Sequence, residues 1–115
     1  MSSSETSTDQ AVGAPSALSG LDSVLNAPKR LAIMAVLSSS SSTDFGFLRR
    51  HLGVSESDLS KQAATLEGAG YLTIHKSGHG RGGVTTYKAT RSGRKAYQRH
   101  RDTLRALLAE SLAED

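Results

Sequence analysis

A glycine-rich segment between two strand-like stretches constrains the fold of this 115-residue chain more than any other feature. Residues 76–87 read KSGHGRGGVTTY. The stretch before the glycines, 71–75, alternates with period two, and the stretch after them, 84–89, is β-branched and aromatic. Both patterns are typical of strands. The segment is therefore predicted to form a β-hairpin with Arg81 at its tip.

The same glycines also allow a second interpretation. Gly78, Gly80 and Gly83 have the G-x-G-x-x-G spacing of a dinucleotide-binding turn. That turn requires a helix directly after it and an acidic residue about 20 residues further on, at the end of another strand. Here a strand follows, and Asp102 lies in an arginine-rich stretch with helical character. We therefore favour the hairpin and expect no cofactor.

Two amphipathic helices are predicted before the hairpin. The first runs from about Phe45 to Leu52 and ends at Gly53; its inward residues are Phe45, Leu48 and Leu52. The second runs from about Glu56 to Ala69 and stops at Gly70; its core residues are Leu59, Ala63 and Leu66. Ser55 is the expected N-cap of the second helix, with Asp58 reaching back as a variant capping box. A turn of three to four residues between two such helices predicts a helix-turn-helix.

The second helix has a polar outer face with small side chains, as a helix that enters the major groove of DNA requires. An ordinary amphipathic helix with a solvated face is the alternative. The glycine-rich basic hairpin favours DNA, since its tip can approach a phosphate backbone closely and Arg81 can extend into a minor groove. The residues expected to contact DNA are Ser55, Ser57, Ser60, Lys61, Gln62 and Thr65 on the helix and Lys76, His79, Arg81 and Lys88 on the hairpin.

Charge is segregated along the chain. Residues 71–105 contain nine of the 14 lysine and arginine residues and a single acidic residue, Asp102, whereas the rest of the chain is net acidic. Such segregation is typical of a nucleic-acid-binding face, although a basic run also occurs on solvated helices.

The amino-acid composition narrows the classes of protein to which the chain could belong. The chain has no cysteine, which excludes disulfides and thiolate metal sites. Residues 1–17 are rich in Ser and Thr and are predicted to be a disordered tail, so that 18–115 form one domain. We expect a cytoplasmic protein without a membrane segment. His75 and His79 would lie about 13 Å apart on a strand, which disfavours a metal site. No arrangement of residues suggests an enzyme.

The segment DFGFLRRHLGVSESDLSKQAATLEGAGYLTIHKSGHGRGGVTTYKATRSGRKAY resembles the winged helix-turn-helix domain of bacterial transcriptional regulators related to the MarR and ArsR groups. The resemblance implies a mostly α fold with a small β-hairpin wing, an α+β class. It also implies a regulator of transcription that binds double-stranded DNA, with helix 56–69 in the major groove and wing 76–88 on the adjacent backbone. A protein-interaction adaptor is the alternative, because winged helices also serve as docking modules.

The ends of the chain predict self-association. A short helix containing Leu18, Leu21 and Leu25 is expected before a helix that begins at Pro28. The last helix, capped by Thr90, carries an apolar stripe that outruns the domain, which favours a homodimer. Packing of the terminal helices within a monomer is the alternative, and a small-molecule effector is left open. The residues expected at the dimer surface are Leu18, Leu21, Leu25, Leu104, Leu107, Leu108 and Leu112.

Overall fold

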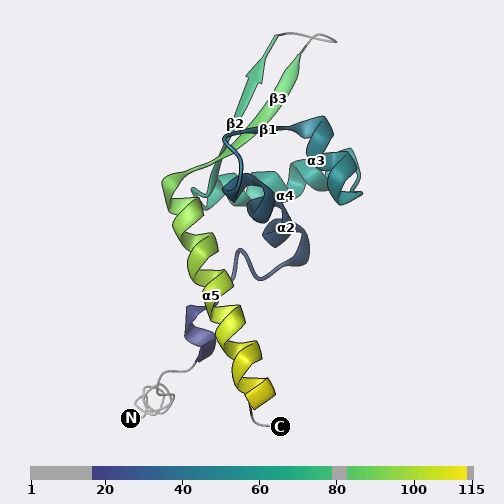
Figure 1. Ribbon diagram of the computed structural model, residues 1–115. Coiled ribbons are helices and arrows are strands. Elements are labelled where there is room, and N and C mark those ends of the chain that lie inside the picture. The colour runs from purple at the N-terminus through teal and green to yellow at the C-terminus, as the bar shows by residue number, and fades with distance from the viewer. Residues whose placement is uncertain (1–16, 79–82, 114–115) are drawn as a thin grey trace, which may run out of the picture.

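The computed structural model describes residues 17–78 and 83–113, with the side chains of 18–78 and 83–110. Helices dominate the described part, and a small sheet lies at one end of it (Figure 1). The elements, in order, are η1 (Ala17–Gly20), α2 (Pro28–Ser38), β1 (Thr43–Asp44), α3 (Phe45–Leu52), α4 (Glu56–Gly68), β2 (Leu72–Ser77), β3 (Val84–Ala89) and α5 (Arg91–Ala113). This is the expected mostly helical winged helix fold.

The predicted hairpin is confirmed as two antiparallel strands. β2 and β3 pair from Leu72 opposite Ala89 to Ser77 opposite Val84, and β1 adds a third strand on the other side of β3. In Figure 1 the hairpin projects away from the helices. Because side chains alternate along a strand, Leu72, Ile74 and Tyr87 lie on one face, which packs on the helices.

The core lies where α2, α3 and α4 meet that face of the sheet. The buried residues of α4 are the three predicted from its periodicity. On α2 the buried residues are Ile33, Met34 and Leu37, whereas Leu31 and Ala35 are only half-buried. The core comprises Leu25, Ile33, Met34, Leu37, Leu48, Leu59, Ala63, Leu66, Leu72, Tyr87 and Ala89.

The turn between α3 and α4 follows the sequence signals. Gly53 ends α3 with a φ of 67°, a left-handed conformation that glycine adopts without a steric penalty. The Ser55 hydroxyl accepts a hydrogen bond from the Asp58 N–H at 3.1 Å, so the N-cap is confirmed. The reciprocal half of the capping box is absent from the hydrogen bonds of the described residues, because the Asp58 carboxylate bonds to Lys29 and Gln62 instead.

The predicted short helix at the N-terminal end is wrong. Only residues 17–20 are helical, in the 3-10 form, and the chain then turns at Asp22. The Asp22 carboxylate accepts hydrogen bonds from the Val24 and Leu25 N–H groups at 2.8 and 3.2 Å. These bonds stabilise a turn where a helix was expected, since a short carboxylate competes for backbone donors.

The last helix, α5, extends from the sheet past the rest of the fold, with η1 beside it (Figure 1). Thr90 caps it as predicted, accepting a hydrogen bond from the Gly93 N–H at 2.9 Å. His100 is fully buried, and its Nδ1 accepts a hydrogen bond from the Asp22 N–H at 3.0 Å. This contact ties the N-terminal turn to α5.

Candidate nucleic-acid interface

The outer face of α4 presents small polar groups around one lysine. Ser57, Ser60, Lys61 and Thr65 are all exposed, as is the capping residue Ser55. The helix is anchored from the opposite side by its buried leucines. It therefore displays short donors and acceptors without bulky side chains in front of them, a surface that a major groove can accommodate.

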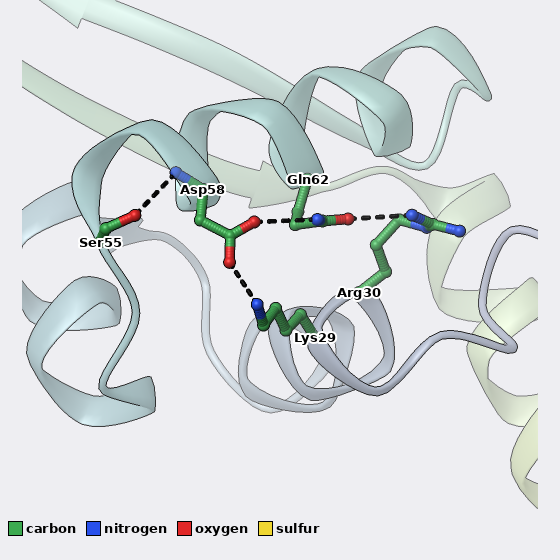
Figure 2. Close-up of polar contacts among 5 residues, drawn as sticks. All are labelled: Lys29, Arg30, Ser55, Asp58 and Gln62. Atoms are coloured by element: carbon green, nitrogen blue, oxygen red, sulfur yellow. Dashed lines mark hydrogen bonds and ion pairs between the residues drawn. The ribbon is translucent and has the colours of Figure 1, made fainter.

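Gln62 differs from the other α4 residues expected to contact DNA, because it is half-buried and faces α2 (Figure 2). Its Nε2 donates to Asp58 Oδ1 at 3.0 Å, and its Oε1 accepts from Arg30 Nη1 at 2.9 Å. Lys29 forms an ion pair with the second oxygen of Asp58. We call these four residues, Lys29, Arg30, Asp58 and Gln62, the α2–α4 bridge. No local pattern indicated this bridge, because the residues that it joins across α2 and α4 lie 29 and 32 positions apart.

The bridge also sets the charge state of Asp58. Hydrogen bonds from Gln62 and from Lys29 lower the pKa of this carboxyl below its ordinary value. Asp58 is therefore anionic in the first turn of α4, where the positive end of the helix dipole favours negative charge.

On the hairpin, the described lysines lie on opposite faces of the sheet. Lys76 pairs with Thr85 and shares the face of Ile74, toward the helices, whereas Lys88 pairs with Thr73 on the other face. Both lysines are exposed. His79 and Arg81, the other two hairpin residues expected to contact DNA, lie outside the described residues.

A cleft of about 570 Å³ separates α4 from the hairpin. Ser60, Lys76 and Thr85 supply hydroxyl and ammonium groups to it, and Glu67 supplies a carboxylate. Tyr87 forms part of the cleft wall, and burial, followed by the nearby Glu67, raises the pKa of its hydroxyl. Thr85 was not expected at the interface; the strand pairing that places it opposite Lys76 is the signal that identifies it.

The expected dimer residues divide into several environments. Leu18 and Leu108 are each 64% exposed, and Leu21, Leu104 and Leu107 are half-buried. Leu25 is fully buried in the domain core, so its assignment to the dimer surface was wrong. Leu112 belongs to α5, but its side chain lies outside the described ones.

Leu104 and Leu108 line an apolar groove of about 370 Å³ between α2 and α5. From α2 come Pro28, Leu31, Ala32 and Ala35, and from α5 come Tyr97, Arg101, Leu104, Arg105 and Leu108. The contribution of α2 is not visible in the sequence, because only the packing of the two helices creates the groove.

Comparisons with known proteins agree with this geometry. The family model described as "Winged helix DNA-binding domain" matches residues 29–108. A transcriptional regulator homologue from Pyrococcus horikoshii OT3 superposes with a TM-score of 0.72 at 24% identity, over 77% of this chain and 88% of that one. YusO from Bacillus subtilis superposes with a TM-score of 0.72 at 19% identity, over 97% and 78% of the two chains.

A third similar structure, the transcriptional regulator MOSR from M. tuberculosis, was solved in complex with DNA. It superposes with a TM-score of 0.65 at 18% identity, over all of this chain and 83% of that one. A comparison with curated proteins finds no matching sequence. Within the described ranges, no helix has the length and apolar content needed to cross a bilayer.

Proposed function

Because the chain belongs to the winged helix DNA-binding domain family, we propose that it is a transcriptional regulator that binds double-stranded DNA sequence-specifically. One observation carries the proposal: the exposed face of α4 combines Ser57, Ser60 and Lys61 with no bulky side chain, next to a cleft that contains Lys76. A helix with this surface fits a major groove about 12 Å wide.

In the proposed complex, Lys61 reads base edges and the hairpin binds the backbone. Lys61 is exposed on the outer face of α4, where an ammonium can donate to guanine O6 and N7. Lys76 and Thr85 face the cleft beside α4, where a backbone phosphate of the bound DNA would pass. Lys88, on the other face of the hairpin, and His79 and Arg81 at its tip complete the proposed contacts. Gln62 supports α4 through the bridge and reaches DNA only if its internal bonds open.

We further infer that the regulator is a homodimer that binds a palindromic operator. The apolar groove between α2 and α5 and the exposed Leu108 provide a surface of the kind that dimers bury. Leu107 and Leu112 belong to α5, whereas Leu18 lies in η1 and Leu21 directly after it, and we include all four in the proposed interface. A two-fold axis between the subunits would repeat the α4 contact in two half-sites.

The test begins with selection of bound duplexes from random DNA, followed by affinity measurements on the selected and scrambled sequences. Lys61→Ala should cost about 1 to 3 kcal/mol on the selected duplex and much less on the scrambled one. Arg81→Ala should weaken both duplexes alike and make the slope of log K against log salt shallower by about one unit. Arg50→Ala, which removes the same charge from the last turn of α3, is the control and should change neither affinity.

The contrary outcome is equally clear. If neither Lys61→Ala nor Arg81→Ala changes duplex affinity at low salt, α4 and the hairpin do not contact DNA. A protein-interaction adaptor would then replace the regulator as the proposed function.

A further inference from the structure

A cavity of about 540 Å³ lies between η1, the segment after α4, and the first turns of α5, away from the cleft beside the hairpin. Arg91, Lys95 and Arg99 line it. These residues are four positions apart, so they lie on one side of the helix and follow its axis for about 12 Å. One side of the cavity wall is therefore formed by a row of three cationic side chains.

These cations are not neutralised by the rest of the described chain. All three are exposed, and their side chains make no hydrogen bond or ion pair with the described residues. Other basic residues of α5 are engaged: Arg94 donates to the Ser38 and Ser40 carbonyl oxygens, and Arg101 pairs with Asp102. Among the described residues, the cavity row thus lacks the side-chain partners that Arg94 and Arg101 have.

Among the described residues, Asp22 supplies the one carboxylate that lines the cavity, and this carboxylate already accepts hydrogen bonds. It accepts hydrogen bonds from the Tyr71 hydroxyl and from the Val24 and Leu25 N–H groups. The hydrogen bond to Asp22 and burial raise the pKa of Tyr71 to about 12, so that its hydroxyl is neutral near neutral pH. The cavity lining keeps a net positive charge of two.

Further donors lie at the start of α5. The N–H groups of Arg91 and Ser92 belong to the first turn of the helix and lack partners within it. The Thr90 hydroxyl, which could satisfy one donor of that turn, is used by the Gly93 N–H. The Ser92 hydroxyl is exposed at the cavity. Together these groups match the acceptor oxygens of a phosphate.

We propose that this cavity binds a small anion of the phosphate class, carrying at least two negative charges, and that its occupancy changes DNA binding. Two guanidinium groups and an ammonium along about 12 Å of helix favour a molecule with more than one charged group over a single monovalent ion. Leu21 and Ala96, which also line the cavity, provide an apolar surface for an organic portion.

The coupling to DNA rests on the proposed function and passes through Tyr71. This residue lines the cavity and follows α4 closely in the chain, where its N–H donates to the Leu66 carbonyl at 3.0 Å. Its carbonyl accepts from the Thr90 N–H at 3.0 Å, which links it to α5. An anion that draws Arg99 toward η1 would shift Tyr71 between them. Because Tyr71 is hydrogen-bonded to Leu66, this shift would change the position of the C-terminal end of α4.

Binding is tested first without DNA, by calorimetric titration of the full chain with pyrophosphate at constant ionic strength. We expect one site per chain. The double variant Lys95→Gln/Arg99→Gln should bind at least tenfold more weakly. The control Arg49→Gln/Arg50→Gln, which removes the same charge from α3, should change affinity less than twofold. Equal weakening by both variants, or no binding by the unaltered chain, overturns the site.

The coupling is then measured on a duplex selected by the protein. Saturating pyrophosphate should change the affinity of the unaltered chain for this duplex at least threefold and leave Lys95→Gln/Arg99→Gln unaffected. An unchanged affinity overturns the coupling. If the double variant loses duplex affinity without pyrophosphate, the cations contact DNA and the proposal is wrong. A chain that binds pyrophosphate but no duplex at any salt concentration refutes the proposed function and leaves the anion site intact.

Discussion

Gly93 lies where α5 passes closest to the segment after α4, and a hydrogen atom is all that fits there. A Cβ at this position would lie 2.0 Å from the Tyr71 carbonyl oxygen and 2.9 Å from the Tyr71 Cα. Tyr71 cannot move freely, because its backbone N–H and carbonyl bond to Leu66 and Thr90. The close approach of α5 to the end of α4 therefore depends on one glycine.

Gly93→Ala should lower the free energy of unfolding by about 2 to 4 kcal/mol, because the methyl group overlaps backbone atoms and the Thr90–Tyr71 hydrogen bond is lost. Chemical denaturation measures the change. Gly68→Ala is the control, since a Cβ there meets nothing within 4 Å, and it should stabilise the protein by up to about 1 kcal/mol. Equal effects of the two substitutions would contradict the close approach.

The hydrogen bond from Tyr71 to Asp22 predicts that the stability of the protein depends on pH. Stability should fall in acid through Asp22 and in alkali through Tyr71. Burial alone would raise the pKa of Asp22, but hydrogen bonds from Tyr71, Leu25 and Val24 outweigh it and lower that pKa. Asp22 therefore contributes stability above its unfolded pKa of 3.8, and this contribution is lost as pH falls through the lower folded value. The pKa of Tyr71 is raised from 10.0 to about 12, so its contribution is complete below pH 10.0 and is lost as pH rises toward 12.

Tyr71→Phe should reduce the free energy of unfolding by about 1 to 2 kcal/mol near neutral pH, as expected for a hydrogen bond to a carboxylate. The difference from the unaltered protein should shrink between pH 10 and pH 12, where the unaltered protein loses the same contribution. Urea titrations across this range measure it. The double variant Asp22→Asn/Tyr71→Phe should lose no more unfolding free energy than the two single substitutions lose in sum, because both remove the same hydrogen bond. A difference that stays constant up to pH 12 argues against the assigned bond.

At the level of elements, the orientation of α4 depends on polar contacts with α2 as well as on the core. Arg30 is central to the α2–α4 bridge, because its Nε donates to the Val24 carbonyl at 2.7 Å while its Nη1 donates to Gln62. One guanidinium thereby fixes both the loop before α2 and the middle of α4. A lysine carries its three N–H donors on one nitrogen, so it does not match the two separate nitrogen positions from which Arg30 reaches Val24 and Gln62.

Arg30→Lys should cost about 1 to 2 kcal/mol of unfolding free energy although the charge is kept. Lys29→Gln, which breaks the other connection of the bridge, should cost less than about 0.5 kcal/mol, because the Lys29 side chain is 54% exposed and exposed ion pairs contribute little. Thermal and urea denaturation of both variants provide the comparison. A larger loss from Lys29→Gln would place the main connection at the ion pair.

At the scale of the whole molecule, the long α5 and the groove beside it favour the proposed homodimer. The apolar groove between α2 and α5 and the leucines that extend along α5 lie outside the domain core. A single α4 covers one half-site, whereas a two-fold dimer reads two, and the genome contains many chance copies of any single half-site. The proposed dimer would therefore set specificity as well as affinity.

Leu108→Asp should convert the proposed dimer to a monomer without unfolding it, because Leu108 is 64% exposed in the single chain. Sedimentation velocity gives the oligomeric state, and circular dichroism shows whether the fold is kept. Ala106→Asp adds the same charge at an exposed position of α5 outside the groove and should leave the dimer intact. A dimer that survives Leu108→Asp would place the interface elsewhere.

The sequence alone determined the features that depend on neighbouring residues. Period-two and helical patterns identified the hairpin and the buried face of α4, and Gly53, Ser55 and Thr90 marked helix ends, because capping and left-handed turns are satisfied within a few residues. The family resemblance was confirmed on the same segments. The residues expected to contact DNA remain predictions, although the periodicity of α4 correctly indicated the exposed face that presents Ser57, Ser60, Lys61 and Thr65.

Tertiary structure decided what depends on residues far apart in the chain. Gln62 has the same polar character as its neighbours, and only the approach of Arg30 turns it toward α2. Leu25 belongs to the core because hydrogen bonds of Asp22 with Leu25 and Tyr71 fold the N-terminal segment back onto the domain. The anion cavity and the apolar groove likewise arise where separate elements meet. At these positions, side-chain direction and burial are set by contacts between elements far apart in the chain, which local periodicity does not report.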